Sequence, residues 1–400
     1  MAEWIVTNLE ECTDVLGDGL HGTPKYTENG EYAFVNGNNL VEGEILIKKE
    51  TKKVDYRQYE KYKKPLTDRT ILVSINGTLG NVGVYDSEKI ILGKSACYFN
   101  VKQSVDKDFI YYVVSSPVFR RYLENNATGT TIKNISLKQM REYTFSIPQI
   151  DEQRRISSVL RKIDEKIKNN KAINNNLLEQ LDQLYAEFSS RSEWSEMTIG
   201  DIADKVAMGP FGSNIKISTF VEYGVPIISG NHLRGYFLEE PSYNYITEEH
   251  AEKLKNSVVY PKDIVFTHAG NIGQVAMIPD GCEFPYYVLS QRQFYLRCNT
   301  ELAVPEYVLL FFHSKIGQHE LLSYANQTGV PSIAQPATNL KKIRLPIPPL
   351  DEQKDWLLVV APIIKMYQNN YQETIKLAEL RDTLLPKLMS GDIDVSEVDI

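Results

Sequence analysis

A seven-residue stretch occurs twice in this chain of 400 residues, once in each half. It reads Ile-Pro-Gln-Ile-Asp-Glu-Gln over residues 147–153 and Ile-Pro-Pro-Leu-Asp-Glu-Gln over residues 347–353. Each copy closes a long Gly- and aromatic-rich segment and opens a strongly periodic one. Self-similarity of this kind is typical of a duplicated structural unit. The chain therefore predicts two related halves, each a globular segment followed by a long helix.

The two periodic segments carry apolar residues at alternating steps of four and three, which is the a and d spacing of a coiled coil. The predicted seam of the helix pair comprises Ile156, Leu160, Ile163, Ile167, Asn170, Leu177, Leu181, Leu184, Trp356, Val360, Ile363, Tyr367, Asn370, Leu377 and Leu384. Both seams are apolar at the ends and polar in the middle, where Asn170 and Asn370 stand at matching positions. Because the connections after the helices are short, we expect the helices to pair antiparallel. The alternative is that each helix lies only on its own globular half.

The globular segments also match one another in short blocks. Gly37-Asn38-Asn39-Leu40 recurs as Gly230-Asn231-His232-Leu233, and residues 71–82 recur as residues 264–275. In the second pair of blocks a β-branched run enters a Gly-x-x-Gly turn and leaves as another strand, which predicts a β-hairpin. The residues between the blocks differ almost everywhere, so one scaffold is expected to carry two different surfaces.

Further matches complete the repeat. Gly19 and Gly22 recur as Gly209 and Gly212, which extends the match towards the start of each globular segment. The run from Phe109 to Leu123 has its counterpart in Tyr307 to Leu321, and we predict one short amphipathic helix for each.

These patterns predict an α+β fold with a pseudo-twofold internal repeat. Two globular mixed α/β domains are expected at residues 1–147 and 191–347. Two long antiparallel coiled-coil helices are expected at 148–190 and 348–390, followed by a C-terminal tail at 391–400.

The composition is that of an ordinary globular protein, with 42% hydrophobic and 24% charged residues. No apolar run is long enough to cross a bilayer, and the first residues lack the pattern of a secretory signal. We therefore expect a cytoplasmic protein with no membrane partner. The formal net charge of −8 argues against a strongly basic nucleic-acid binder, although it leaves room for local basic patches.

Catalytic motifs are missing from the sequence. It has no Asp/Asn-Pro-Pro-aromatic motif of an adenine methyltransferase, no Gly-x-Gly-x-x-Gly and no Gly-x-x-x-x-Gly-Lys-Ser/Thr phosphate loop. The six histidines are scattered singly, so no metal site is expected. The Gly-x-x-Gly turns lack the strand-turn-helix setting that cradles phosphate, which favours a structural role. We expect no catalytic residues.

The polar residues that stand out lie on predicted loops. Residues 48–64 interleave lysines with tyrosines, and such a mixture can neutralise and bind phosphates, although a merely solvated face is the competing interpretation. Asparagine and glutamine side chains in the repeated blocks could pair with adenine edges or could simply shape turns. The candidate DNA-binding residues are Asn36, Asn38, Asn39, Lys52, Lys53, Arg57, Lys61, Lys63, Lys64, Asn76, Thr78, Asn81, Asn214, Lys216, Asn231, His232, Arg234, His268, Asn271, Gln274, Gln291, Arg292 and Gln293.

Two variable domains, each followed by a long helix that opens with Pro-x-hydrophobic-Asp-Glu-Gln, resemble the specificity subunit of Type I restriction–modification enzymes. The closing stretch from Leu384 to Ile393 also resembles the usual C-terminus of that family. Pro362 and Arg381 depart from a regular apolar seam in the second helix.

The resemblance implies a function. Each globular domain would be a target recognition domain that reads one half of a bipartite, asymmetric site in double-stranded DNA, and the helix pair would set the spacing. Two modification (methyltransferase) subunits would dock on the helices, and restriction (translocase/endonuclease) subunits would join them. The chain itself would hold no cofactor, because S-adenosylmethionine, ATP and Mg would act in the partner subunits.

Two other classes of function compete with this interpretation. A coiled-coil scaffold with two globular protein-binding ends would share the same pattern, and the 24 tyrosines would suit protein interfaces. An enzyme with an unfamiliar site is the third class, and the missing motifs argue against it.

Overall fold

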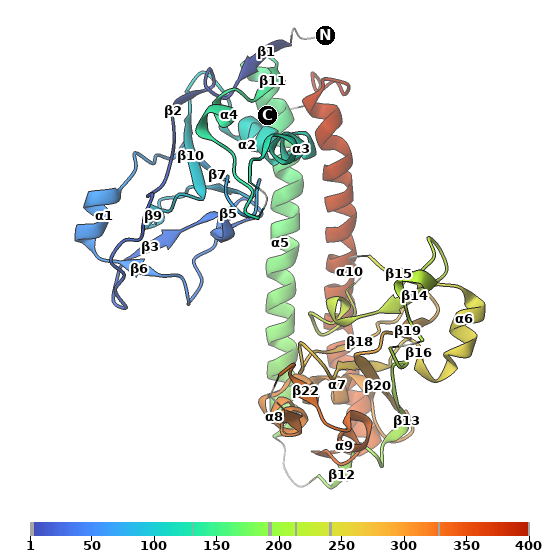
Figure 1. Ribbon diagram of the computed structural model, residues 1–400. Helices are drawn as coiled ribbons and strands as arrows, with labels where there is room; N and C mark the ends of the chain where they lie inside the picture. The colour runs from blue at the N-terminus through green and yellow to red at the C-terminus, as the bar shows by residue number, and fades with distance from the viewer. Residues whose placement is uncertain are drawn as a thin grey trace. The chain divides into compact units, whose positions relative to one another are not determined.

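The computed structural model describes residues 4–129, 131–190, 194–212, 214–239, 242–326 and 329–398. The chain divides into two compact units, with residues 1–169 and 373–400 in unit 1 and residues 170–372 in unit 2. Two helices of 40 residues, α5 (Ile150–Ser189) and α10 (Leu350–Met389), each give one part to each unit (Figure 1). The units therefore include parts of both helices, whereas the sequence boundaries treat each helix as a separate segment.

The described part of unit 1 is built on a four-stranded antiparallel sheet in the order β2-β10-β7-β8. Its strands are β2 (Thr13–Asp18), β7 (Thr70–Ser74), β8 (Val82–Val84) and β10 (Ala96–Val101). A second sheet, in the order β6-β3-β9, joins β3 (Tyr32–Val35), β6 (Lys53–Val54) and β9 (Ile90–Leu92), with β3 parallel to β9. Two further pairs are β1 (Ile5–Asn8) with β11 (Thr144–Ile147) and β4 (Leu40–Val41) with β5 (Glu44–Ile45).

Unit 2 repeats this topology in its described part. The order β13-β20-β17-β18 joins β13 (Ala203–Met208), β17 (Ile264–Thr267), β18 (Val275–Met277) and β20 (Gln293–Cys298). The second sheet, β15-β14-β19-β16, joins β14 (Val225–Ile228), β15 (Asn244–Ile246), β16 (Val258–Val259) and β19 (Tyr287–Leu289), with β14 parallel to β19. The remaining pairs are β12 (Glu196–Thr198) with β23 (Arg344–Pro346) and β21 (Ala325–Asn326) with β22 (Ser332–Ile333). The predicted internal repeat and both predicted hairpins, β7–β8 and β17–β18, are confirmed.

Short helices cover these sheets. Those of unit 1 are α1 (Tyr56–Tyr62), α2 (Lys107–Ser115), α3 (Pro117–Asn126) and α4 (Leu137–Arg141). Those of unit 2 are α6 (Glu248–Lys253), α7 (Pro305–His313), α8 (Lys315–Leu322) and α9 (Pro336–Leu340). The 3₁₀ turns are η1 (Gly37–Asn39), η2 (Ile217–Thr219), η3 (Gly230–His232) and η4 (Lys255–Ser257).

The prediction of one helix over residues 109–123 and one over residues 307–321 was wrong, because each run forms two helices. Ser116 ends α2 and caps α3 by accepting a hydrogen bond from Phe119 N at 3.1 Å, and Pro117 occupies the first position of α3. Ser314 caps α8 in the same way, with Gly317 N as the donor at 3.1 Å. A serine that caps a new helix stops the preceding one, because its own backbone is extended.

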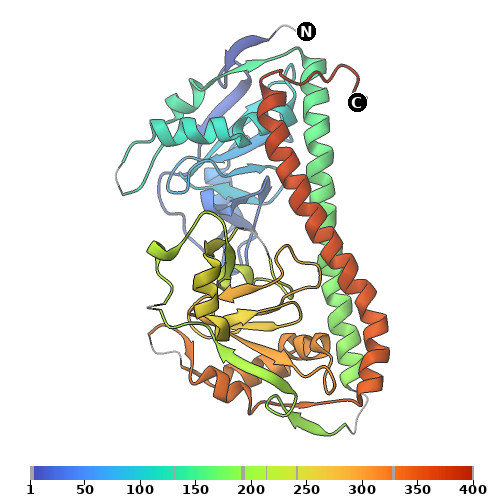
Figure 2. The same ribbon diagram turned by 90° about the vertical axis from the view of Figure 1, so that its right-hand side faces the viewer.

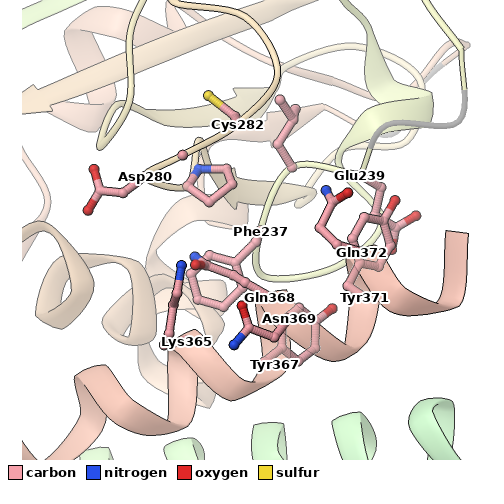
Figure 3. A pocket seen from close by; sticks show the side chains of 13 residues that line it. Phe237, Glu239, Asp280, Cys282, Lys365, Tyr367, Gln368, Asn369, Tyr371 and Gln372 are labelled. Atoms are coloured by element: carbon pink, nitrogen blue, oxygen red, sulfur yellow. The ribbon is translucent and has the colours of Figure 1, made fainter. Parts of the chain in front are cut away.

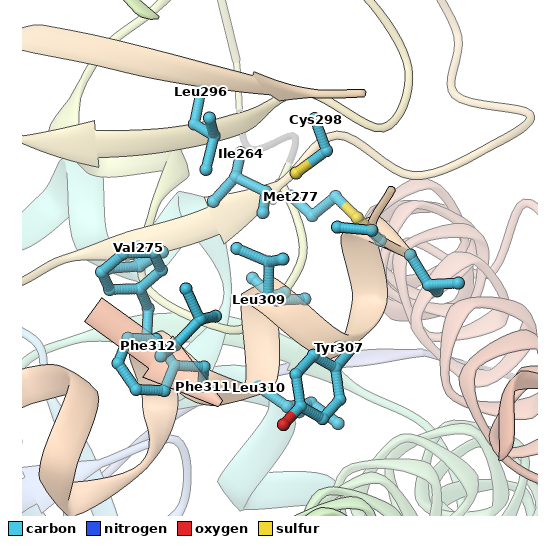
Figure 4. Close-up of a cluster of buried hydrophobic side chains, with 14 of the residues drawn as sticks. Ile264, Val275, Met277, Leu296, Cys298, Tyr307, Leu309, Leu310, Phe311 and Phe312 are labelled. Atoms are coloured by element: carbon cyan, nitrogen blue, oxygen red, sulfur yellow. The ribbon is translucent and has the colours of Figure 1, made fainter. Parts of the chain in front are cut away.

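The largest core of unit 2 lies between the four-stranded sheet and α7. Figure 4 shows Leu309 of α7 next to Ile264 of the sheet, and Phe312 packs on Phe266 with ring centroids 4.9 Å apart. Tyr307 lies on the other side of α7, where its ring contacts Phe188 and Trp356. Nearly all of α7 is buried, so it lacks the amphipathic character that the sequence suggested. In unit 1 the matching helix α2 packs on its sheet through Phe109 and Val113, among other residues.

Within each unit, α5 and α10 run antiparallel and side by side (Figures 1 and 2). In unit 1, Ile156 and Leu160 share a core with Leu385 and Leu388. In unit 2, Phe188 stacks on Trp356 with ring centroids 5.5 Å apart, and Asn174 Nδ2 donates to the carbonyl oxygen of Tyr367 at 3.1 Å. Many of these side chains also pack on the sheet and helices of their own unit, so the helices complete the two cores as well as pairing with each other.

The repeated Asp-Glu-Gln stretch has a structural explanation. Gln153 Oε1 accepts from Asp106 N at 2.9 Å, and Gln353 Oε1 accepts from Val304 N at 2.8 Å. Both side-chain amides also donate to the proline carbonyl five residues earlier, at 2.8 Å. Each buried glutamine therefore fastens the start of a long helix to the segment before α2 or α7.

Candidate functional site

The turn η1 in unit 1 is held in shape by Asn36, which precedes it, and by Asn39 at its end. Asn36 N donates to Asn39 Oδ1 at 3.0 Å, and Asn39 Nδ2 donates to the carbonyl oxygen of Leu46 at 3.0 Å. Asn39 is buried, whereas the side chain of Asn38 between them is exposed. The bonds of Asn36 and Asn39 thus fix the turn, and the turn presents the Asn38 amide outward.

The turn between β7 and β8 packs against η1. Gly77 and Gly80 have φ of 79° and 78°, a region that favours glycine, and they allow the chain to turn tightly. Asn81 Nδ2 donates to the carbonyl oxygen of Gly37 at 3.5 Å, and Ser95 Oγ bonds to both Gly37 N and Asn36 Oδ1. Three loops, residues 36–39, 76–81 and 93–95, therefore lie together, and we name them loop cluster 1.

Unit 2 builds the equivalent arrangement from different residues. Ser229 N donates to His232 Nδ1 at 3.0 Å, so the neutral ring carries its proton on Nε2, which lies 2.9 Å from the carbonyl oxygen of Ser242. Gln274 Nε2 donates to the carbonyl oxygen of Gly230 at 3.1 Å, as Asn81 does to Gly37 in unit 1. Residues 229–232, 268–274 and 290–293 form loop cluster 2.

Burial divides the predicted DNA-binding residues into three groups. The exposed residues are Asn38, Lys52, Arg57, Lys61, Lys63, Thr78, Asn214, Lys216, Asn231, Arg234, Asn271, Gln291 and Arg292. The half-buried residues are Asn36, Lys53, Lys64, Asn76, Asn81, His268 and Gln274. The buried residues are Asn39, His232 and Gln293. The buried residues and several half-buried ones already make hydrogen bonds within the loops. The exposed residues are therefore the ones that can contact a ligand.

The basic stretch of unit 1 joins loop cluster 1 at one end only. Asn39 Nδ2 lies 3.4 Å from Thr51 Oγ1, which ties the start of the stretch to η1. Further along, Tyr59 of α1 stacks on Tyr32 with ring centroids 4.0 Å apart. Lys63 pairs with Glu60 at 2.9 Å. The tyrosines thus anchor α1 to β3, and Lys52, Arg57 and Lys61 remain exposed.

The remaining candidates of unit 2 lie within loop cluster 2 or on neighbouring stretches of the chain. Burial lowers the pKa of His268, and its Nε2 lies 3.2 Å from the carbonyl oxygen of Gln291. Asn214 and Lys216 belong to the loop between β13 and β14, where the carbonyl oxygen of Asn214 lies 2.8 Å from His250 Nε2. Arg234 is exposed and close enough to Glu239 to oppose the rise in the pKa of that carboxyl, which burial causes.

A small pocket in unit 2 lies against α10. Phe237, Glu239, Lys365, Tyr367 and Tyr371 line it, and Figure 3 shows Lys365 and Tyr367 entering from the helix. Its volume of about 170 Å³ is below the roughly 300–1,000 Å³ of small-molecule sites. The exposed amide and basic side chains that the sequence singled out gather instead at the loop clusters, and we place the candidate site there.

Neither a metal cluster nor a membrane span is found in the part of the chain that the structure describes. Within residues 4–398, apart from the short gaps named above, no three His, Cys, Asp or Glu side chains are grouped to hold a metal ion. Over the same described ranges, every helix is too short or too polar to span a bilayer.

All of the predicted seam residues are at least half-buried. The buried ones are Ile156, Leu160, Ile167, Asn170, Leu177, Leu181, Trp356, Val360 and Tyr367. The half-buried ones are Ile163, Leu184, Ile363, Asn370, Leu377 and Leu384. Asn370 Nδ2 donates to Asn174 Oδ1 at 3.1 Å in unit 2, and in unit 1 Arg381 Nη1 donates to Asp164 Oδ1 at 2.9 Å. The departure at Arg381 is therefore an ion pair between the helices.

Sequence reasoning missed two sets of residues. The sequence shows Gln153 and Gln353 only as part of the repeated stretch. Their structural role appears from the hydrogen bond that each accepts from a distant backbone N–H. Lys94 and Ser95 in loop cluster 1 match Gln291 and Arg292 in loop cluster 2. Ile75 N donates to the carbonyl oxygen of Ser95, and His268 N donates to that of Arg292, which establishes the match. The residue types at these positions differ, so the sequence alone does not reveal it.

Comparisons with known proteins agree with these observations. The family described as Type I restriction modification DNA specificity domain matches residues 1–179 and again residues 191–377. The specificity subunit of the Type I restriction enzyme MjaIX from Methanocaldococcus jannaschii is 24% identical over 445 residues, covering 99% of this chain and 95% of the relative. That of the EcoBI enzyme from Escherichia coli is 19% identical, covering 81% and 73%. The crystal structure of a Type I S subunit from M. genitalium has a TM-score of 0.59 at 20% identity and covers 97% of this chain and 96% of that one.

Proposed function

This chain belongs to the Type I restriction modification DNA specificity family and carries its domain twice, and from that premise we propose that each unit reads one half of a bipartite, asymmetric DNA site. The role of specificity subunit in a Type I restriction–modification system follows from the family. The proposal adds which loops read the DNA, how the two readings are spaced and where partners bind.

One observation carries the proposal. The two loop clusters have matching hydrogen bonds, Asn81 to Gly37 and Gln274 to Gly230, yet at two of three matched outward positions they present different exposed side chains. The outward positions pair Asn38 with Asn231, Thr78 with Asn271 and Lys94 with Gln291. A common frame with different outward groups is the arrangement expected of two readers of different sequences.

The exposed groups suit a DNA duplex chemically. Asparagine and glutamine amides pair bidentately with adenine edges in the major groove, and arginine pairs with guanine. Lys52, Arg57, Lys61 and Lys216 are exposed cations that can neutralise phosphates. Because the formal net charge is −8, we expect the free chain to bind DNA weakly and its partners to supply much of the phosphate contact.

We propose that α5 and α10 set the gap between the two half-sites. A helix of 40 residues is about 60 Å long. At ~3.4 Å per base pair that length corresponds to about 18 base pairs, which is room for two short half-sites and a gap. Inserting seven residues into each helix would add about 10 Å, or about three base pairs, to the tolerated gap. An unchanged gap would rule out the helices as the spacer.

The outer face of α10 supports docking of the modification subunits. Leu358, Val359 and Met366 of unit 2 are 75%, 55% and 52% exposed, and Pro362 between them is also exposed. At 100° per residue these positions fall within one face of the helix, opposite Trp356 and Val360 in the core. We propose that this apolar face binds a modification (methyltransferase) subunit. S-adenosylmethionine, ATP and Mg are proposed to act in the modification and restriction subunits.

The proposal is tested by selection and footprinting. A purified complex of the chain with its modification subunits is incubated with a pool of random 40-base-pair duplexes, and the bound DNA is sequenced. We expect two short specified tracts separated by a fixed unspecified gap, both protected from cleavage. No enrichment at any salt concentration would defeat the DNA-reading proposal.

The competing function, a protein-binding scaffold, shares one observation with this proposal, namely the exposed apolar face of α10. Substituting Leu358→Glu together with Met366→Glu should release the modification subunits in both cases. If the chain is a DNA reader, the same substitutions should also reduce site-specific methylation in cells. The methylation that remains should still occur at the same two half-site sequences.

A further inference from the structure

Phe211 is among the most exposed large hydrophobic side chains of the described residues, with 84% of its surface accessible. It lies on the loop between β13 and β14 in unit 2, which spans residues 209–224. Single exposed hydrophobic residues are common and need no explanation by themselves. The position of this ring within the repeat is what gives it meaning.

The root of the loop is fixed, so the ring has a defined place. Gly209 N donates to the carbonyl oxygen of Gln293 at 2.8 Å, and a Cβ on Gly209 would collide with the backbone of Ser290. Pro210 is buried, and Asn214 N closes a turn onto the carbonyl oxygen of Phe211 at 2.8 Å. Phe211 therefore extends into solvent from a rigid base.

That base adjoins loop cluster 2. A Cβ on Gly212 would collide with the side-chain oxygen of Gln291, so residues 211–212 lie directly beside the loop that carries Gln291 and Arg292. Gln291 and Arg292 are exposed on that loop, and the loop of Phe211 itself carries the exposed Asn214 and Lys216. A surface of this mixture suits a polyanion that also offers flat apolar faces.

Unit 1 places a ring at the same position. His21 lies between Gly19 and Gly22, as Phe211 lies between Gly209 and Gly212. Gly19 is pressed against the backbone of Leu92 and Gly93, and Lys94 N donates to the carbonyl oxygen of Leu20 at 3.1 Å. The His21 side chain is 70% exposed, with Nε2 2.5 Å from Asp18 Oδ2.

The two rings share planarity rather than hydrophobicity. An apolar docking surface for a protein would be served by phenylalanine but poorly by a histidine that contacts a carboxylate. A flat π-face is offered by both, and every nucleic-acid base stacks on such a face. The repeat therefore favours a nucleobase as the common occupant.

Resting on the proposed function, we propose that Phe211 and His21 are base-stacking residues, each of which opens one base step at the margin of its half-site and packs against the exposed base. Apolar and aromatic wedges of this kind unstack and kink duplexes bound by other proteins. Stacking also tolerates any base, so these rings would add affinity and local distortion while the loop clusters supply the sequence preference.

The test uses the full chain in complex with its modification subunits and a duplex selected from the random pool by the wild-type complex. 2-Aminopurine, whose fluorescence rises when it is unstacked, replaces each adenine in turn. We expect a rise at one step beside the half-site of unit 2, lost in Phe211→Ala and kept in Phe211→Trp. Affinity should fall about 5- to 150-fold in Phe211→Ala.

Ile217→Ala is the matched control, because Ile217 is 87% exposed on the same loop but has no planar ring. We expect it to leave both fluorescence and affinity unchanged, and His21→Ala to remove the rise beside the half-site of unit 1. Equal affinity and fluorescence in wild type and Phe211→Ala would overturn the stacking proposal, as would equal losses in Phe211→Ala and Ile217→Ala. A wild-type complex that selects no sequence would instead overturn the proposed function.

Discussion

In unit 1 the turn Gly37–Asn39 is closed by the amide of Asn39, whereas the matching turn of unit 2 is closed by the imidazole of His232. Each side chain accepts a hydrogen bond from the backbone N–H three residues earlier. Its other polar atom contacts a backbone carbonyl oxygen, that of Leu46 in unit 1 and that of Ser242 in unit 2. The middle residue of the turn, Asn38 or Asn231, is exposed in both. The backbone geometry is therefore kept by different chemistry, and variation is tolerated wherever the same bonds can still be made.

The glutamines at the start of α5 and α10 differ in how many bonds they make, and this gives the largest expected effect. Gln353 is fully buried and bonds to Val304 N and to the carbonyl oxygens of Leu302 and Pro348. Substitution Gln353→Leu leaves these groups unpaired and should destabilise unit 2 by about 2–4 kcal/mol. Gln153, with a bond to Asp106 N and one to a proline carbonyl, should matter less.

Urea unfolding of the full chain, followed by amide hydrogen exchange in α7 and in α2, measures the two effects separately. Gln183→Leu on the exposed side of α5 is the control and should change little. Equal losses for Gln153→Leu and Gln353→Leu would show that the third bond contributes nothing.

The exposed amides of the loop clusters give the next largest effect. Asn231→Ala should change the base preference in one half-site and Asn38→Ala that in the other, each with a loss of about 1–3 kcal/mol in discrimination if the amide pairs bidentately with a base. Sequencing the methylated sites of a host that carries the complete system reads both halves at once. The exposed Asn125→Ala on α3 is the control. A change in both halves from one substitution would contradict independent reading.

How far the sequence predicts this molecule depends on the range of the contacts involved. The repeat and the hairpins rest on local patterns and are confirmed, and α5 and α10 begin at Ile150 and Leu350, two residues after the expected 148 and 348. The distinction between Asn38 and Asn39 could not be predicted, because it depends on partners such as Leu46 and Thr51 beyond the repeated block. The break between α2 and α3 is local, and the Ser-Pro pair could have revealed it.

In mild acid, His313 should cost unit 2 stability in a way that has no counterpart at the matching position of unit 1. His313 of α7 stacks on Tyr236 with centroids 3.6 Å apart, and burial lowers its pKa to about 4. The matched residue in unit 1 is Ser115, which does not titrate. Since the unfolded histidine takes up a proton near its ordinary pKa of about 6.5 and the folded one does not, stability falls as pH drops from there towards 4.

The loss at pH 5.5 should be about 1.2 kcal/mol relative to pH 7. Melting temperatures of the wild-type chain and of the His313→Phe variant, measured between pH 7 and pH 4, isolate the contribution of the histidine. Asp182, which lies beside Tyr236, is present in both proteins. Burial raises the pKa of Asp182, which acts in the opposite sense as pH falls. Parallel curves for the two proteins would exclude the histidine as the cause.

The polar contacts between α5 and α10 give the smallest expected effect and differ in kind between the units. Unit 1 uses the ion pair of Arg381 with Asp164, which also accepts from Tyr112 OH, whereas unit 2 uses the amide pair of Asn370 with Asn174. Asn370→Leu removes the neutral hydrogen bond to Asn174 and adds apolar surface to a half-buried seam, so the loss of that bond should change the stability of unit 2 by less than about 1 kcal/mol.

Arg381→Leu leaves the Asp164 carboxylate without its cation and should destabilise unit 1 more than Asn370→Leu destabilises unit 2. Hydrogen exchange along the two helices in the full chain compares them directly. If the two substitutions have equal effects, the charge adds nothing to the contact. If Asn370→Leu proves the more damaging, the amide pair holds the register of the helices, as a polar seam residue does in a coiled coil.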